Sequence, residues 1–220
     1  MMDKEILKLY FIMGSNNTGG RNPEEVLQEA LQGGITCFQF REKGQGALLE
    51  EEKWQLGRKM KAQCAAFHVP FIVNDDVDMA IRLEADGIHI GQEDDPASKV
   101  KERCPSRMVI GVSVRTIEEA HRAAADGADY LGVGPMFATD TKEDAKAPVG
   151  LEGIRRLRAE GIALPIVGIG GIDASNAADI VEAGADGVSL ISAISLADAP
   201  EDAARELRSR LNGPAEKQKK

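Results

Sequence analysis

Two acidic side chains at the ends of neighbouring predicted strands are the first residues whose types and spacing suggest chemistry. Asp75 and Asp94 each follow a short apolar run. Adjacent strands lie about 4.8 Å apart, so carboxylates at equivalent strand ends can face one small cavity. Two carboxylates without a cysteine or histidine companion suit a hard, oxygen-seeking ion, usually Mg²⁺. Helix capping is the alternative that the residues leave open, with Asp75 or Asp76 capping one helix and Asp95 capping the next.

Three cations are predicted to lie beside these carboxylates. Arg41 and Lys43 are two positions apart in an extended segment, so their side chains point the same way, and Lys142 lies on the long segment 137–150. In a chain of net charge −9, cations beside a metal indicate a polyphosphate-like anion. Surface salt bridges, for example between Arg41 and Glu42, are the alternative.

A glycine-rich segment indicates a second anion site. Gly168-Ile-Gly-Gly171 ends the seventh predicted strand, and the eighth ends at Ile191-Ser192. Glycines let backbone N–H groups approach an anion closely, and the loops after strands seven and eight are the usual phosphate site of (β/α)₈ barrels. A plain tight turn is the alternative. Two anion sites in one opening predict two phosphorylated substrates and a group transfer.

These residues require a scaffold that brings many strand ends together, and a weak internal repeat predicts one. Each repeat has a helix end, a Gly or Asp turn and a short apolar run, as in segments 83–90 and 181–190. Short apolar runs without strict alternation are typical of parallel strands covered on both faces. Eight such runs are present, at 8–13, 35–40, 70–74, 87–90, 108–112, 130–133, 165–168 and 187–190.

Segments of helical periodicity lie between and after these runs. They span 23–31, 48–67, 77–83, 97–103, 117–125, 151–159, 174–182 and 200–211. Pro23 and Pro200 favour helix starts, and Thr116 with Glu119 predicts a capping box. Eight strands alternating with eight helices predict an α/β fold, a single (β/α)₈ TIM barrel over residues 1–212. A doubly wound open sheet is the rival, and the polar segment 213–220 is predicted to be a disordered tail.

Composition narrows the class of protein. The chain has 27 basic and 36 acidic residues and no basic block, which argues against nucleic-acid binding. No apolar run approaches the roughly 18 residues of a membrane span, and the N-terminus lacks a signal-peptide pattern. Cys37, Cys64 and Cys104 form no CxxC pair and are interpreted as reduced thiols. We therefore expect a cytoplasmic protein that takes small molecules, and a homo-oligomer stays open.

Known catalytic motifs of other classes are absent from the sequence. It contains no Ser-His-Asp set, zinc motif or Walker loop. His89 falls on the fourth predicted strand and is interpreted as a packed core residue rather than a catalytic one.

Taken in order, the motifs resemble the thiamine-phosphate synthase family over residues 8–195. They include Gln39-Phe-Arg-Glu-Lys43, Phe71-Ile-Val-Asn-Asp75, Gly87-Ile-His-Ile-Gly-Gln-Glu-Asp94, Gly111-Val-Ser113, Thr139-Asp-Thr-Lys142, Gly168-Ile-Gly-Gly-Ile172 and Val188-Ser-Leu-Ile-Ser192. The resemblance implies a transferase that joins 4-amino-2-methyl-5-hydroxymethylpyrimidine diphosphate to a thiazole phosphate, or to its carboxylated form. Thiamine phosphate and pyrophosphate would be the products of a dissociative displacement assisted by one Mg²⁺ per subunit.

The resemblance also implies roles for individual residues. The pyrimidine diphosphate would be held by Gln39, Phe40, Arg41, Glu42, Lys43, Asn74, Ser113 and Lys142. The thiazole phosphate would be held by Thr139, Thr141, Gly171, Ile191 and Ser192, with Asp140 in the same loop. The residues implied in catalysis are Arg41, Lys43, Ser113 and Lys142. Asp75 and Asp94 would bind Mg²⁺, which separates them from Asp76 and Asp95.

Two positions depart from the family pattern, and three rival functions remain open. Arg115 stands where many members have histidine, and Asp140 stands where glutamate is frequent. A thiazole tautomerase of the same fold would need no diphosphate site, so the acidic pair and the cations argue against it. A sugar-phosphate epimerase or isomerase would need an acid–base pair. A non-catalytic binder of thiazole phosphate is the rival from outside the enzymes.

Overall fold

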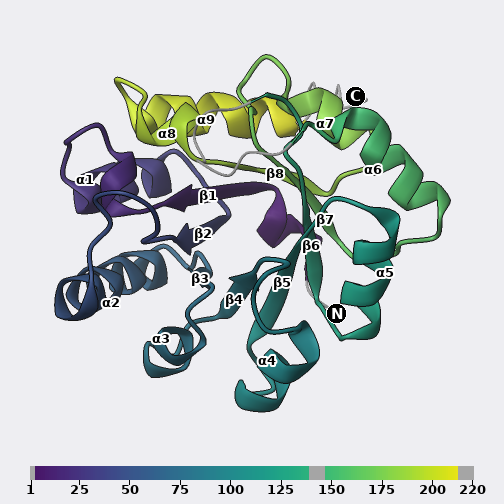
Figure 1. The fold of residues 1–220 in the computed structure, drawn as a ribbon. Coiled ribbons are helices and arrows are strands. Elements are labelled where there is room, and N and C mark those ends of the chain that lie inside the picture. Colours follow the sequence, from purple (N-terminus) through teal and green to yellow (C-terminus); the bar gives the residue numbers. More distant parts are fainter. Residues whose placement is uncertain (1–2, 139–146, 213–220) are drawn as a thin grey trace, which may run out of the picture.

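Eight parallel strands close into a barrel in the computed structural model, which describes residues 3–138 and 147–212. The ring runs in sequence order and closes where β1 pairs with β8, with Leu9 opposite Val188 (Figure 1). The single TIM barrel is confirmed, and closure excludes the doubly wound open sheet. The strands are β1 (Leu9–Met13), β2 (Cys37–Phe40), β3 (Phe71–Asn74), β4 (Gly87–Ile90), β5 (Val109–Val114), β6 (Tyr130–Val133), β7 (Ile166–Ile169) and β8 (Gly187–Leu190).

Helices surround the barrel, one after each strand (Figure 1). They are α1 (Pro23–Gln32), α2 (Glu50–Ala66), α3 (Val77–Arg82), α4 (Ala97–Arg103), α5 (Ile117–Ala125), α6 (Gly150–Ala159), α7 (Ala177–Glu182) and α9 (Pro200–Leu211). Pro23 and Pro200 each stand in the first turn of a helix, and the Thr116–Glu119 capping box is present. Among the described helices, none is long and apolar enough to cross a membrane.

The differences from the predicted elements have local causes. The helix predicted to begin at residue 174 begins at Ala177, because the Asp173 carboxylate accepts from the Ser175 N–H at 2.8 Å and holds a turn there. Three short elements were not predicted: η1 (Lys4–Leu7), η2 (Ser15–Asn17) and α8 (Ser192–Ser195). None exceeds four residues, which is too short for a periodicity to register.

The core has two layers, one inside the barrel and one between the strands and the helices. On β1, Tyr10 and Ile12 belong to the inner cluster, whereas Phe11 and Met13 belong to the outer one. All five residues of this strand are therefore buried. Burial on both faces explains why the strands read as continuous apolar runs.

The repeat in the sequence corresponds to a fixed arrangement at the amino ends of the strands. Asp86, Asp129 and Asp186 each stand just before a strand, and each carboxylate accepts the backbone N–H near the start of the preceding strand, at 2.8–2.9 Å. Thr36 does the same for Leu9 through its hydroxyl, at 2.8 Å. The residue two positions before each of these four side chains has a left-handed backbone. It is a glycine before Thr36, Asp129 and Asp186, and it is Glu84 before Asp86. The repeat thus ties each strand to its neighbour at the end away from the chemistry.

Asp186→Ala should lower the free energy of unfolding by about 2 kcal/mol, because three donors lose the charged carboxylate that accepts from them. Its carboxylate accepts from Ile166 N at 2.9 Å and pairs with Arg158 at 2.6 Å and Lys4 at 2.7 Å. The free energy of unfolding in denaturant, followed by circular dichroism, measures the loss. Asp202→Ala is the matched control, because its exposed pair with Arg205 should contribute less than about 0.5 kcal/mol. Equal losses in the two variants would contradict the anchoring role.

Candidate active site

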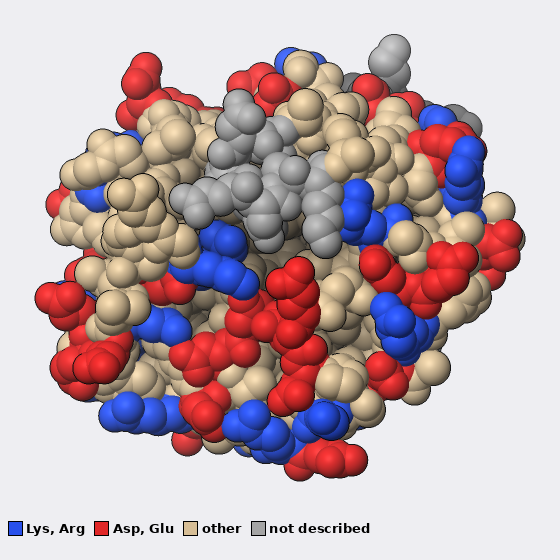
Figure 2. Space-filling model, viewed as in Figure 1, with Lys and Arg blue, Asp and Glu red and all other residues tan. Residues whose placement is uncertain are grey.

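The carboxyl ends of the strands open into one cavity of about 850 Å³. That volume suits one or two small molecules. Most strands contribute a residue to the lining, including Gln39, Asn74, His89, Ser113, Gly132, Ile169 and Ser189. In Figure 2, basic and acidic side chains meet at the hollow on this face of the molecule.

Asp75 and Asp94 lie together in this cavity, as their positions on neighbouring strands predicted. Their carboxyl groups are close enough to interact directly, and Asp94 Oδ2 also accepts from Gly91 N at 2.7 Å. Burial, and then the neighbouring Asp75 carboxylate, raise the pKa of Asp94 above its usual value. Lys43 Nζ lies 2.6 Å from Asp75 Oδ2, and that hydrogen bond raises the pKa of Lys43.

The structure resolves which aspartates cap helices. Asp76 is the N-cap of α3, where its side chain accepts from Met79 N at 3.0 Å. Asp75, one residue earlier, has a left-handed backbone with φ of 59°, a conformation that costs a non-glycine residue about 1–3 kcal/mol. Asp95 does not cap α4, which has no side-chain cap, and lies 3.8 Å from Lys99 instead. The capping alternative is therefore confirmed for Asp76 and wrong for Asp95, and Asp75 does not cap α3.

The donors at this corner fit a divalent cation of the magnesium type. Two close carboxylates repel each other, and a shared cation relieves that repulsion. Across the part of the chain that the structure describes, no group of three His, Cys, Asp or Glu residues could hold a metal. A metal here would rely on Asp75 and Asp94 and on oxygen atoms of water or ligand, which is the usual manner of Mg²⁺.

Arg41 and Lys43 both line the cavity, as their spacing predicted, whereas Glu42 between them does not. The Glu42 carboxylate accepts from the backbone and hydroxyl of Ser15 and from Leu48 N at 2.8 Å. These bonds tie the loop after β1 to the segment before α2. Glu42 therefore supports the loop that carries the two cations.

Phe40 also lies away from the cavity. Its ring is 1% exposed in the layer between barrel and helices, where it stacks on Phe71 with centroids 6.1 Å apart. Its side chain thus packs behind the residues that resemblance assigned to the pyrimidine diphosphate. Gln39, Asn74 and Ser113 of that set do line the cavity.

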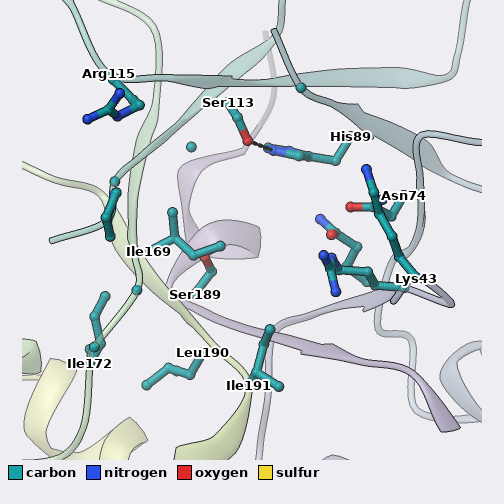
Figure 3. A pocket seen from close by; sticks show the side chains of 18 of the residues that line it. Lys43, Asn74, His89, Ser113, Arg115, Ile169, Ile172, Ser189, Leu190 and Ile191 are labelled. Atoms are coloured by element: carbon teal, nitrogen blue, oxygen red, sulfur yellow. Dashed lines mark hydrogen bonds between the residues drawn. The ribbon is translucent and has the colours of Figure 1, made fainter. Parts of the chain in front are cut away.

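His89 is both a buried residue and part of the cavity wall. It is 7% exposed, and its Nε2 lies 2.9 Å from Ser113 Oγ (Figure 3). The interpretation of His89 as core packing alone is therefore incomplete. A polar side chain within an apolar strand, opposite Gly111 of the adjoining β5, is the signal that indicates its position.

The other end of the cavity is apolar and glycine-rich. Gly170 and Gly171 follow β7 with φ of 94° and 68°. A Cβ atom on Gly171 would lie 2.8 Å from the Ala138 carbonyl oxygen, so only glycine fits against that segment. Ile191 and Ser192 also line this end. Of its apolar wall, sequence reasoning predicted Ile191 and missed Ile169, Ile172 and Leu190 (Figure 3).

Four predicted residues, Thr139, Asp140, Thr141 and Lys142, lie outside the described residues, as does the predicted tail. Arg115, the departure from the family pattern, lines the cavity mouth (Figure 3). Its Nη2 donates to the Ala147 carbonyl at 3.1 Å. Arg115 thus adds a cation to the rim and contacts the segment that leads into α6.

Comparisons with known proteins agree with the fold and identify the family. The family model described as thiamine monophosphate synthase matches residues 9–194. Thiamine-phosphate synthases of Bacillus cereus (strain AH187) and Bacillus thuringiensis (strain Al Hakam) are each 54% identical, covering 92% of this chain and 91% and 92% of theirs. The solved structure of thiamine phosphate pyrophosphorylase from Pyrococcus furiosus superposes with a TM-score of 0.84 at 36% identity, covering 95% of this chain and 97% of that one. The chain therefore belongs to the thiamine monophosphate synthase family of transferases.

Proposed function

We propose that this protein is a thiamine-phosphate synthase. It joins 4-amino-2-methyl-5-hydroxymethylpyrimidine diphosphate to 4-methyl-5-(2-phosphoethyl)thiazole, or to its carboxylated form, and releases pyrophosphate. The observation that carries the proposal is one cavity with two different ends in a chain of this family. Arg41, Lys43, Asp75 and Asp94 form the charged end, and a glycine turn with an apolar wall forms the other.

The charged end suits the diphosphate. Lys43 and Arg41 bind its oxygens, since both cations line the cavity beside the acidic pair. Asp75 and Asp94 would hold the Mg²⁺, which neutralises charge on the departing diphosphate when bound. The pairing of Lys43 with Asp75 at 2.6 Å supports a site in which this cation serves both the anion and the carboxylates.

The glycine-rich end suits the thiazole phosphate. A wall of isoleucine and leucine side chains packs against an apolar ring, and the turn at Gly170 and Gly171 lets backbone approach the phosphate. The two substrates then lie in one cavity with their reacting ends toward its middle. Holding both partners in position converts a bimolecular reaction into an effectively unimolecular one.

The reaction needs charge stabilisation more than proton transfer. The bond between the pyrimidine methylene carbon and the diphosphate oxygen breaks, and its electron pair leaves with the oxygen. The electron-rich aminopyrimidine stabilises the resulting cation, and the lone pair of the thiazole nitrogen forms the new C–N bond. Arg41 and Lys43 stabilise the charge that develops on the leaving group. No strong general base is required for this displacement.

A turnover assay with both substrates tests the proposal directly. With Mg²⁺ present, thiamine phosphate and pyrophosphate should form in equal amounts, and neither should form when one substrate is omitted. A non-catalytic binder would bind thiazole phosphate without turnover. A tautomerase would act on the thiazole phosphate alone. Either result would contradict the synthase.

Asp75→Asn and Asp94→Asn should each weaken Mg²⁺ binding and lower turnover, because each removes one charged ligand. The fold should survive, because asparagine has nearly the same shape as aspartate. Excess Mg²⁺ should partly restore each single variant by mass action, whereas the double variant should not respond. A Mg²⁺ titration of product formation measures both effects. Asp76→Asn and Asp95→Asn are matched neighbours, and their titration curves should follow the wild type. Identical curves for all variants would contradict the metal site.

Gly171→Val should weaken thiazole phosphate binding more than pyrimidine diphosphate binding. A side chain at this left-handed position would collide with the Ala138 carbonyl and block backbone approach to the phosphate. Calorimetric titration with each ligand separates the two affinities, after thermal unfolding has shown that the variant is folded. Equal weakening of both ligands in a folded variant would contradict the assignment of this end.

A further inference from the structure

Five side chains from five strands form a continuous hydrogen-bonded network through the barrel interior. Gln39 Nε2 donates to Tyr10 Oη at 2.8 Å, and Tyr10 Oη lies 2.9 Å from Tyr130 Oη. Tyr130 Oη lies 2.9 Å from His89 Nδ1, and His89 Nε2 lies 2.9 Å from Ser113 Oγ. We call these residues the core network. Gln39, His89 and Ser113 line the cavity, while the two tyrosines are buried beneath it.

Two glycines on the barrel strands make room for the network. Gly111 of β5 lies between His89 and Tyr130 in the strand register, and a Cβ there would lie 2.1 Å from the Tyr130 ring. A Cβ on Gly132 of β6 would lie 3.0 Å from His89 Cε1. The backbone of two strands is therefore shaped around the tyrosine and histidine rings.

The hydrogen bonds of the core network run in one direction. Burial raises the pKa of both tyrosines well above the usual value, so both remain neutral hydroxyls. Because Gln39 donates to Tyr10, the Tyr10 proton goes to Tyr130, and the Tyr130 proton goes to His89 Nδ1. The opposite direction would leave the buried Tyr10 hydroxyl with the Cys37 sulfur, a weak acceptor, in place of the Tyr130 oxygen, which is less favourable. His89 therefore carries its proton on Nε2 and donates to Ser113.

We propose that Tyr10, Tyr130 and His89 are positioning residues that fix which atoms Gln39 and Ser113 offer to the substrate. Ser113 Oγ accepts from His89, so its own proton is directed to an acceptor in the cavity. Gln39 uses its amide nitrogen inside the core network, which leaves its carbonyl oxygen to accept. The pair matches a ligand with a donor near Gln39 and an acceptor oxygen near Ser113, as an aminopyrimidine phosphoester provides. This role rests on the proposed function, which assigns both end residues to that substrate.

Nitrogen-15 NMR of histidine-labelled protein tests the direction without any substrate. His68 and His121 are exposed, so the three histidines can be told apart. We expect His89 in the wild type to be neutral with its proton on Nε2. In Tyr130→Phe, which keeps the ring and removes one hydroxyl, Nδ1 loses its donor and the two tautomers should mix. A wild-type His89 protonated on Nδ1, or an unchanged tautomer in Tyr130→Phe, would overturn the proposal.

Steady-state kinetics tests the consequence for the substrate. Tyr130→Phe should lower kcat/KM for the pyrimidine diphosphate by about tenfold, the value of roughly one hydrogen bond, and leave KM for the thiazole phosphate unchanged. Thr36→Val is the matched control, because it removes a hydroxyl with two hydrogen bonds at the far end of the barrel. In this variant, kcat/KM for the pyrimidine diphosphate and KM for the thiazole phosphate should both equal the wild-type values. Equal losses for both substrates would overturn the proposal.

Tyr10→Phe keeps the proposal testable if Tyr130→Phe does not fold. This substitution separates only Gln39 from the core network. We therefore expect kcat/KM for the pyrimidine diphosphate to fall, while the His89 tautomer stays as in the wild type. An unchanged kcat/KM for the pyrimidine diphosphate in Tyr10→Phe would overturn the proposal that Tyr10 positions Gln39. An inactive wild type with His89 protonated on Nε2 would instead contradict the proposed synthase and leave the core network standing.

Discussion

The close approach of two carboxylates, Asp75 and Asp94, is the constraint on which the site depends. Like charges at short range in a half-buried cavity are unfavourable, and burial with the neighbouring charge raises the pKa of Asp94. Asp75 also holds a left-handed backbone. Such costs persist only where the surrounding structure enforces them, and here adjacent β3 and β4 do so. Lys43 offsets part of the repulsion through its bond to Asp75. The arrangement suits a ligand that brings its own cation and an anion together.

The barrel separates the residues that stabilise it from those that act on ligands. At the amino ends of the strands, Thr36, Asp86, Asp129 and Asp186 satisfy the backbone of neighbouring strands. At the carboxyl ends, the loops instead present cations, carboxylates and glycines to one cavity. The contacts that join the strands in pairs thus lie at the opposite end of the barrel from the strained Asp75 backbone. The family resemblance and the physical pattern lead to the same end of the same barrel.

Much of the fold was predictable, because strands buried on both faces and helices with one buried face leave distinct patterns in a sequence. The boundaries of the helices were less predictable. The turn at Asp173 moves the start of α7 to Ala177, and α8, with only four residues, is too short to leave a pattern. In the site, the positions of Asp75 and Asp94 at strand ends predicted that they lie together. That Glu42 turns away from the cavity is visible only in the structure, where its carboxylate accepts from the Leu48 N–H. The hydrogen bonds of His89 were missed because one partner, Tyr130, lies 41 positions away and reads as an ordinary core residue. Contacts of that kind depend on strand register, which a single sequence does not reveal.

A crystal structure with Mn²⁺ and pyrophosphate, recorded at the manganese absorption edge, shows whether Asp75 and Asp94 share a metal ion with the diphosphate. We expect one anomalous peak about 2.0–2.1 Å, the usual distance for a magnesium-type ion, from an oxygen of Asp75 and an oxygen of Asp94. We also expect Lys43 to leave Asp75 and bind an oxygen of the pyrophosphate. A pyrophosphate bound elsewhere, with no manganese between the two carboxylates and the Lys43–Asp75 pair intact, would mean that the acidic pair is not a metal site.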